Sequence, residues 1–249
     1  MIPTPFWLDF SRDALLLDVD GTLLDIAPLP DLVRVPDSLT KILARLHEHL
    51  GGALALVSGR TTRDLDRLFA PLLLPTVGIH GVELRVRYGA PAIRFAEPIP
   101  SAVREGIATL VDGIEGAFSE DKAFAVVLHY RQAEEHCHIL KSRIESFLRT
   151  PMGKGLHSQD GKCLFEIRRD GADKGSGVRR LMQHPPFSKR RPIFIGDDKT
   201  DEDAFAILPD YSGVAVSVGR RIESAPHTFD KPEDVRRWLR ALAAGEMEA

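Results

Sequence analysis

One stretch of this 249-residue chain indicates both its fold and its chemistry: Leu15-Leu16-Leu17-Asp18-Val19-Asp20-Gly21-Thr22-Leu23-Leu24. Its apolar start, bounded by a turn, predicts a buried strand of the kind found in parallel sheets. Two carboxylates follow at the carboxyl end of the strand, which is where open α/β sheets bind their ligands. A buried strand has little reason to end in two acids unless a cation lies there, so the stretch predicts a site for a hard divalent metal.

The two carboxylates are spaced so that both can serve one reacting centre. Asp18 can present one oxygen to a metal and the other to an electrophile. Asp20, two residues on, points to the same side of an extended chain and can transfer a proton at the same centre. Thr22 adds a hydroxyl and a backbone N–H for phosphate oxygens. The competing interpretation is an ordinary strand-to-turn boundary with acidic capping residues.

A second polar turn, Ser58-Gly59-Arg60, follows the apolar run at 53–57. A serine followed by a glycine can bring hydroxyl and N–H groups close to a phosphate oxygen. The turn also opens a helix predicted over 61–69, whose N-terminus favours anions. A plain strand-to-helix turn is the alternative interpretation.

Two further polar segments, 172–175 and 196–202, also lie at a helix start and a strand end. Lys174 opens a predicted helix, where a cation is unfavourable unless it pairs with an anion. Asp197 and Asp198 end an apolar run, and beside Asp18 they would form a negative pocket that requires a cation.

These four segments resemble, in order, motifs I to IV of the haloacid dehalogenase (HAD) superfamily of phosphatases. The resemblance implies that Asp18 is the nucleophile and that Asp20 is the general acid and base. The third motif usually reads Asn-Lys-Gly, and Asp173 departs from it while leaving the lysine in place. The resemblance assigns phosphate binding to Thr22, Ser58, Gly59 and Lys174, magnesium binding to Asp18, the carbonyl of Asp20 and Asp197, and supporting roles to Arg60, Asp198 and Asp201.

Composition excludes several classes of protein. The net charge of −3 and the pI of about 6.3 provide no basic field for nucleic acid or an anionic membrane. No apolar run approaches the roughly 20 residues of a membrane helix, and residues 1–10 lack the pattern of a signal peptide. Cys137 and Cys163 match neither a zinc site nor a disulfide framework, which favours the reducing cytoplasm. The sequence leaves the oligomeric state open, with a monomer as the default expectation.

The order of predicted elements indicates an α/β fold. Strands at 15–17 and 53–57 flank a helix, capped by Asp37 or Ser38, in a right-handed βαβ unit. A third strand is expected over 76–84, followed by a short hairpin. A helix over 232–244 closes this part of the chain.

An insertion interrupts that series, because the predicted order changes to α-β-α-β-β. We place this small α+β domain at 99–170. Its position between the second and third motifs is similar to that of a C2-type cap in the HAD superfamily. The fold class is therefore a Rossmann-like HAD core with a parallel sheet, at 1–98 and 171–249, plus the inserted cap domain.

Segments in and near the insertion resemble trehalose-6-phosphate phosphatases: Gly-Ile-His-Gly-Val-Glu at 78–83, Glu-Asp-Lys at 120–122, His-Tyr-Arg at 129–131 and Phe-Glu-Ile-Arg at 165–168. In that family, acidic and basic cap residues hold the sugar hydroxyls. A solvated sheet face is the alternative interpretation of these polar residues. The resemblance implies a sugar-binding set of His80, Glu120, Lys122, Arg131 and Glu166.

The implied function is hydrolysis of trehalose 6-phosphate by a magnesium-dependent phosphatase, through an aspartyl-phosphate on Asp18. Asp20 separates this reaction from dehalogenation, which needs no acid for the leaving group. The alternatives are another capped phosphatase, acting on sucrose phosphate or mannosyl-phosphoglycerate, or a phosphomannomutase. A sugar-phosphate sensor without activity is the alternative from another class, and the intact motif residues argue against it.

Overall fold

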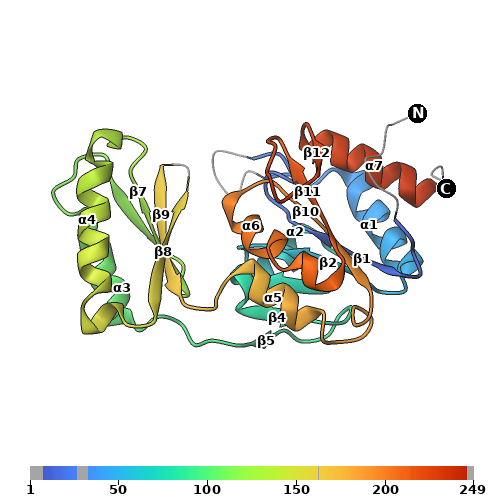
Figure 1. Cartoon of the computed structure of the whole chain (residues 1–249), viewed down its shortest axis with the longest axis horizontal. Helices are drawn as coiled ribbons and strands as arrows, with labels where there is room; N and C mark the ends of the chain where they lie inside the picture. Colours follow the sequence, from blue (N-terminus) through green and yellow to red (C-terminus); the bar gives the residue numbers. More distant parts are fainter. Residues whose placement is uncertain (1–7, 27–32, 162, 246–249) are drawn as a thin grey trace. The chain divides into compact units, whose positions relative to one another are not determined.

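The computed structural model describes residues 8–26, 33–161 and 163–245. The chain forms two compact units (Figure 1): unit 1 is Met1–Phe95 with Asp173–Ala249, and unit 2 is Ala96–Ala172. The insertion predicted at 99–170 falls inside unit 2. Most of the proline-rich loop that follows the first predicted strand, and Lys162 in a predicted turn, lie outside the described residues.

Unit 1 contains a mixed sheet that is parallel except for the antiparallel pairings of β3 with β4 and of β4 with β5. This arrangement confirms the α/β fold class. The strands, in spatial order, are β12 (His227–Phe229), β11 (Val214–Val218), β10 (Arg191–Gly196), β1 (Asp13–Leu17), β2 (Leu54–Val57), β3 (Thr76–Gly78), β4 (Glu83–Arg85) and β5 (Ile93–Arg94). The sequence analysis did not predict β12.

Strand β1 is the centre of this sheet and is buried along its whole length. It pairs in parallel with β10 on one side and with β2 on the other, so Leu16 lies opposite Phe194 and Ala55. Chain order reverses here, because β2 follows β1 on one side and the much later β10 lies on the other. Such a switch point leaves a crevice at the carboxyl ends of the strands, where ligands of α/β proteins bind.

Two layers of helices flank the sheet in unit 1 (Figure 1). Helix α1 packs against α7, and α5 packs against α6. The helix predicted over 232–244 is confirmed. The helices of this unit are α1 (Asp37–His49), α2 (Thr62–Leu68), α5 (Lys174–Leu181), α6 (Lys199–Phe205) and α7 (Pro232–Ala244), with a 3-10 turn at Leu208–Tyr211.

The predicted side-chain cap of α1 was wrong. Pro36 precedes the helix, Asp37 is its first residue, and no side chain caps it. An acidic residue in the first turn still suits the helix dipole, so Asp37 acts through charge rather than through a capping hydrogen bond.

The strand predicted over 76–84 was also wrong, because the chain reverses within it. Strand β3 ends at Gly78, a 3-10 turn covers Ile79–Gly81, and β4 runs back antiparallel. Ile79 and His80 both adopt positive φ, 47° and 48°. A β-branched residue rarely does so, which explains why the apolar pattern gave no sign of a turn.

Unit 2 is a four-stranded antiparallel sheet with two helices packed on one face. Strand β6 was missed by the sequence analysis because its composition is polar. The elements of unit 2 are α3 (Ser101–Ala108), β6 (Phe118–Asp121), β7 (Ala125–His129), α4 (Cys137–Leu148), β8 (Leu156–Gly161) and β9 (Leu164–Arg169), with 3-10 turns at Thr109–Val111, Glu134–His136 and Pro151–Gly153.

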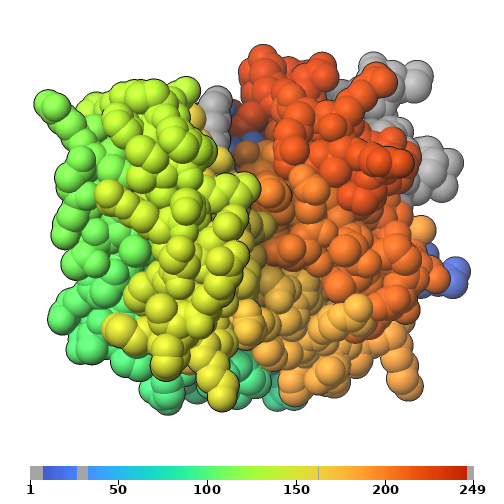
Figure 2. All heavy atoms as spheres, turned by 60° about the vertical axis from the view of Figure 1, so that its left-hand side comes forward, coloured from blue at the N-terminus to red at the C-terminus, as the bar shows by residue number. Residues whose placement is uncertain are grey.

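The unit 2 core lies between these two helices and the sheet. Val126 and Leu128 of β7 and Phe165 and Ile167 of β9 point toward the helices and are buried. Figure 2 shows the outer surface of the helices, in green and yellow-green. No helix in the described part of the chain is long and apolar enough to cross a bilayer.

We predict that Leu16→Ala costs about 2–5 kcal/mol of unfolding free energy, because Leu16 is fully buried in the central strand. Urea unfolding followed by circular dichroism measures the change. Ile93→Ala on the exposed edge strand is the control and should stay within about 0.5 kcal/mol of the wild type. Equal losses in the two variants would contradict the assignment of β1 as the centre of the core.

Candidate active site

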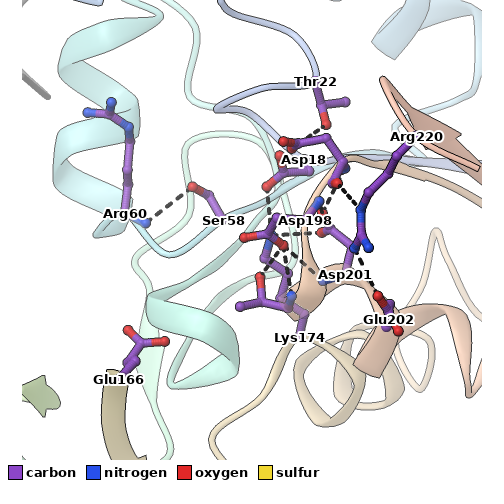
Figure 3. Close-up of polar contacts among 12 residues, drawn as sticks. Asp18, Thr22, Ser58, Arg60, Glu166, Lys174, Asp198, Asp201, Glu202 and Arg220 are labelled. Atoms are coloured by element: carbon purple, nitrogen blue, oxygen red, sulfur yellow. Dashed lines mark hydrogen bonds and ion pairs between the residues drawn. The ribbon is translucent and has the colours of Figure 1, made fainter. Parts of the chain in front are cut away.

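A buried ion pair joins motif I to motif III at the carboxyl end of β1. Lys174 Nζ donates to Asp18 Oδ1 over 2.7 Å, and both side chains are almost fully buried. The other oxygen of Asp18 accepts no hydrogen bond from the described residues. Asp18 is therefore held in a fixed orientation with one oxygen available for chemistry; Figure 3 shows Asp18 among its polar neighbours.

Asp201 is the second partner of Lys174, and it is fully buried. Its Oδ1 accepts from Lys174 Nζ at 2.7 Å, while its Oδ2 accepts from the backbone N–H groups of Asp197 and Asp198 at 2.9 and 3.0 Å. Both oxygens of Asp201 are thus committed. This aspartate fixes the loop after β10 and the lysine at once.

The charge on Lys174 follows from these contacts. Burial by itself lowers the pKa of a lysine, yet the carboxylates of Asp18 and Asp201 raise the pKa of Lys174 well above its usual value. The cation at the start of α5, unfavourable for the helix dipole, is therefore compensated by two carboxylates. The anionic partners that the sequence predicted for Lys174 are therefore present, as Asp18 and Asp201.

Asp197 follows β10 and lies against motif I. Thr22 Oγ1 donates to Asp197 Oδ1 over 3.2 Å, so the threonine hydroxyl orients a carboxylate. Gly21 adopts a φ of 88°, and a Cβ placed on it would lie 2.1 Å from Asp197 Oδ2. The glycine of motif I is thus required for backbone conformation and for the close approach of Asp197. Phosphate binding by Thr22 stays a prediction.

Four carboxylates, those of Asp18, Asp197, Asp198 and Asp201, surround the single ammonium of Lys174. Burial raises the pKa of Asp18 to about 7, and the neighbouring Asp197 and Asp198 add to the rise. Burial likewise raises the pKa of Asp197 to about 7, with Asp201 and Asp198 contributing. The pocket carries more negative charge than Lys174 can neutralise, so it favours a further cation or protons.

Asp198 differs from its neighbours. Burial pushes its pKa upward, but Lys174 and the hydrogen bond from Thr200 outweigh it and hold the pKa of Asp198 below its usual range. Asp198 Oδ1 caps α6, accepting from the backbone N–H groups of Thr200 and Asp201 at 2.9 and 3.1 Å. Its role is to start the helix and to keep the loop in place.

The residues at this point fit a magnesium ion. Asp18, Asp197 and Asp201 each offer one oxygen, and these atoms lie within 4.8 Å of one another. Carboxylate oxygen is the donor that hard divalent cations prefer. Because both oxygens of Asp201 already accept hydrogen bonds, Asp18 and Asp197 are the carboxylates with capacity for a metal. The carbonyl of Asp20 as a third ligand stays a prediction.

Asp20 is bound to Arg60 by two hydrogen bonds. Arg60 Nε donates to Asp20 Oδ2 at 2.7 Å, and the second guanidinium nitrogen donates to Oδ1 at 2.8 Å. The backbone N–H of Arg60 also donates to Ser58 Oγ at 3.2 Å (Figure 3). Motif II is therefore connected to Asp20 through a charged fork, the geometry in which arginine binds carboxylates most firmly.

The turn at Ile79–Gly81 is attached to motif II. The N–H groups of Ile79 and His80 donate to the carbonyls of Arg60 and Ser58, at 3.0 and 3.1 Å. A Cβ on Gly59 would lie 2.4 Å from His80 Nε2, so only glycine permits the imidazole to lie there. The structure places His80 beside motif II in unit 1, and its sugar-binding role stays a prediction.

The N-terminus of α2 is not an open anion site. Thr61 Oγ1 accepts from the N–H of Asp64, and the carboxylate of Glu83 accepts from the N–H of Thr62 at 2.8 Å. Glu83 is buried and also binds Arg94. This helix start does hold an anion, as expected, but the anion is a carboxylate of the chain itself.

The departure at Asp173 has a structural explanation. Asp173 is the N-cap of α5, and its Oδ1 accepts from the N–H of Ser176 at 2.7 Å in a reciprocal capping box. An aspartate supplies the same capping oxygen as the asparagine of the usual motif. The substitution leaves Lys174 in place at the first helical position.

In unit 2, the strand register brings three predicted sugar-binding residues onto one face of the sheet. Glu120 lies opposite Val127, and Val127 lies opposite Glu166. Lys122 Nζ lies 3.8 Å from Glu120 Oε2 on the same face. Arg131 lies beyond the end of β7 and outside these strands.

Two contributors were missed by the sequence analysis. Arg220, after β11, donates to the Asp197 carbonyl at 3.1 Å and to Glu202 Oε1 at 2.8 Å. Glu83 fixes α2, as described above. A lone arginine in a loop carries no sequence signal, although its place just after a strand end is one that sheet topology could have indicated.

The chain is similar to trehalose-phosphate phosphatases in sequence and in fold. The family model described as trehalose-phosphatase matches residues 16–232. A trehalose-6-phosphate phosphatase of Escherichia coli is 37% identical over 236 residues, covering 93% of this chain and 87% of that protein. A probable trehalose-phosphate phosphatase of Sinorhizobium fredii is 37% identical, covering 94% and 89%. The C-terminal domain of trehalose-6-phosphate phosphatase from C. albicans superposes with a TM-score of 0.80 at 23% identity, covering 96% of this chain and 94% of that one, and shows the same fold.

We predict that magnesium affinity falls as the pH drops from 8 to 6. Asp18 and Asp197, with pKa values of about 7, bind protons below that pH and must release them before they bind a metal. Calorimetric titration at pH 6.5 in two buffers of different ionisation enthalpy measures the proton release. An affinity that stays constant between pH 6 and 8 would contradict the assignment.

We predict that Gly21→Ala lowers magnesium affinity at least tenfold, because the new methyl group displaces the Asp197 carboxylate. Gly89→Ala is the matched control. Gly89 also has a positive φ, 68°, but no atom lies within 4 Å of its added Cβ, so it shares the backbone strain of about 1–2 kcal/mol without the clash. Similar losses of magnesium affinity in both variants would show that backbone strain, and not displacement of Asp197, lowers the affinity.

Proposed function

The chain belongs to the trehalose-phosphatase family, and from this premise we propose that it is a magnesium-dependent phosphatase that hydrolyses trehalose 6-phosphate to trehalose and phosphate. One observation carries the proposal: Asp18 has one oxygen fixed by the buried Lys174 and the other available beside Asp197. A nucleophilic carboxylate needs this arrangement, because it must be ionised, oriented and still accessible.

Asp18 attacks phosphorus with its available oxygen and forms an aspartyl-phosphate, while the sugar oxygen leaves. Lys174 keeps the nucleophile in place and lies where a phosphoryl oxygen can accept a hydrogen bond. Ser58 and the backbone at Gly59 bind the remaining phosphoryl oxygens. Positioning and charge stabilisation are the main contributions to phosphoryl transfer, so these fixed donors supply most of the rate enhancement.

The metal would be held by Asp18 and Asp197, with the carbonyl of Asp20 as a third protein ligand. Bound magnesium supplies charge neutralisation, which lets a phosphate dianion approach a cluster of carboxylates. Asp201 and Asp198 serve this site as positioning residues, since their oxygens fix Lys174 and the start of α6.

Asp20 donates a proton to the leaving sugar oxygen. It then removes a proton from the water that attacks the aspartyl-phosphate, so that the bond between phosphorus and Asp18 breaks and phosphate is released. In the structure, both of its oxygens accept from Arg60. A carboxylate bound in this way is a base rather than an acid, so the pair with Arg60 must open, and Asp20 must gain a proton, before it can protonate the leaving group. Arg60 is therefore a positioning residue that sets the resting state of Asp20.

In our proposal the sugar is bound by Glu120, Lys122 and Glu166 of unit 2. Arg131 of the same unit and His80 of unit 1 are further contacts. A disaccharide offers many hydroxyl donors and acceptors, which carboxylate and ammonium groups match. We propose the reducing cytoplasm as the location, on the strength of the two free thiols, Cys137 and Cys163.

Phosphate release from a panel of sugar phosphates tests the proposal. We expect a strong preference for trehalose 6-phosphate, dependence on magnesium and loss of activity with EDTA. Asp18→Asn should lower kcat by about 10⁴-fold or more, because it removes the nucleophile, and Asp20→Asn by about 10²- to 10⁴-fold, because it removes the general acid.

The controls separate chemistry from specificity. Preference for sucrose phosphate or mannosyl-phosphoglycerate would keep the catalytic core and overturn the substrate. Substantial turnover by purified Asp18→Asn would overturn the mechanism. No hydrolysis of any phosphomonoester in the presence of magnesium would favour a sugar-phosphate sensor.

A further inference from the structure

The sheet of unit 2 has a second face, which points away from α3 and α4. The register aligns Glu120, Val127, Glu166 and Gln159 in one row across β6, β7, β9 and β8. The adjacent row contains Ala125, Arg168 and His157. This face therefore holds a group of charged and polar side chains beside the proposed sugar-binding carboxylates.

Glu166 and Arg168 are the buried charges of this face, with exposed fractions of 7% and 3%. They lie two residues apart on β9, so both side chains emerge on the same face. Arg168 carries a guanidinium nitrogen 3.9 Å from Glu166 Oε2. Charges removed from water to this extent need partners that fix them, because an unpaired buried charge is strongly destabilising.

Arg168 is itself fixed from the neighbouring strand. Its Nε donates to His157 Nε2 over 3.1 Å, and His157 Nδ1 lies 3.1 Å from Asp170 Oδ1. Arginine offers donors only, so His157 Nε2 must be an acceptor. The imidazole is therefore neutral, with its proton on Nδ1, where it donates to Asp170. Hydrogen bonds thus run from Asp170 through His157 to Arg168, and the guanidinium they fix lies within ion-pair distance of Glu166.

We propose that Asp170, His157 and Arg168 form a positioning relay that holds the Glu166 carboxylate in the orientation in which it binds the sugar. This inference rests on the proposed function and extends it to three residues that contact no substrate. A carboxylate held in advance loses less conformational entropy when the hydroxyl donors of the sugar arrive, so the relay contributes affinity.

The second proposed carboxylate is held differently. Glu120 Oε2 accepts a hydrogen bond from His129 Nε2 at 3.0 Å, its side chain is 43% exposed, and Lys122 Nζ lies 3.8 Å from the same oxygen. Glu120 is therefore more free to adapt than Glu166. The relay gives the sugar-binding face one fixed carboxylate beside an adaptable one. It affects sugar affinity and leaves the rate of phosphoryl transfer unchanged.

The test compares His157→Phe with the wild type on two substrates, trehalose 6-phosphate and p-nitrophenyl phosphate. We expect KM for trehalose 6-phosphate to rise about 10-fold, near the upper end of the cost of ordering one side chain when a ligand binds, with kcat within about twofold. Turnover of p-nitrophenyl phosphate, which has no sugar, should stay within about twofold. His138→Phe, at an exposed position on α4, is the matched control and should behave as the wild type.

Two further variants separate a relay from a general packing role. His157→Gln retains an acceptor for Arg168 Nε and should restore KM to within about threefold of the wild type. In a Glu166→Gln background, His157→Phe should add no further rise in KM, because the relay acts only through Glu166. Asp170→Ala, at an exposed position, should also raise KM. This variant replaces His157→Phe in the test if His157→Phe folds poorly.

An equal rise in KM with and without Glu166→Gln would overturn the relay, as would a normal KM in both His157→Phe and Asp170→Ala. These outcomes leave the proposed function intact. A wild-type protein that does not prefer trehalose 6-phosphate over p-nitrophenyl phosphate would instead overturn the proposed function, and the relay with it.

Discussion

The buried ammonium of Lys174 is the interaction on which the site depends. It lies between Asp18 at the end of β1 and Asp201 at the start of α6, with 2.7 Å to each carboxylate. Lys174 is 156 positions from Asp18 and 27 positions from Asp201 in the chain. Removing the lysine would leave two carboxylates without compensation inside the protein, a change that costs far more than a surface pair. The same contact that permits the charges to be buried also aims the Asp18 oxygen, so folding and orientation of the nucleophile have one cause.

The loops around this ion pair are fixed by close backbone approach and by local strain. Gly21 lets the chain pass Asp197 at a distance that no side chain would allow, and Gly59 does the same for His80. Ile79 adopts a positive φ, and the carbonyls of motif II hold the turn in which it lies. Strain of this kind persists only where the surroundings over-determine the conformation, which is characteristic of functional sites. The turn that the sequence pattern concealed is thus part of what supports motif II.

Sequence predicted well what depends on local pattern. The apolar strands β1, β2 and β10 and the helix α7 were found because their periodicity and their bounding turns are local signals. Strands β6 and β12 were missed, since one is polar and the other short. The meeting of Asp18 and Lys174 could be inferred from strand ends and helix starts. The contact of Arg220 with Asp197 depends on tertiary position and has no local signal. The prediction of β3 and β4 as one strand failed because the reversal rests on hydrogen bonds to a distant loop.

Aspartate appears at five positions of this site, and partners rather than residue type distinguish the roles. Asp201 has both oxygens committed and can only position its neighbours. Asp198 caps a helix, and Asp20 is bound by an arginine fork. Asp18 and Asp197 each keep an oxygen that no described residue of the chain binds, and burial raises the pKa of both to about 7. An unsatisfied, desolvated carboxylate is destabilising by itself, so its retention fits the metal and phosphoryl binding that we propose for this site. The division between committed and available oxygens is therefore what separates the scaffold of the site from its chemistry.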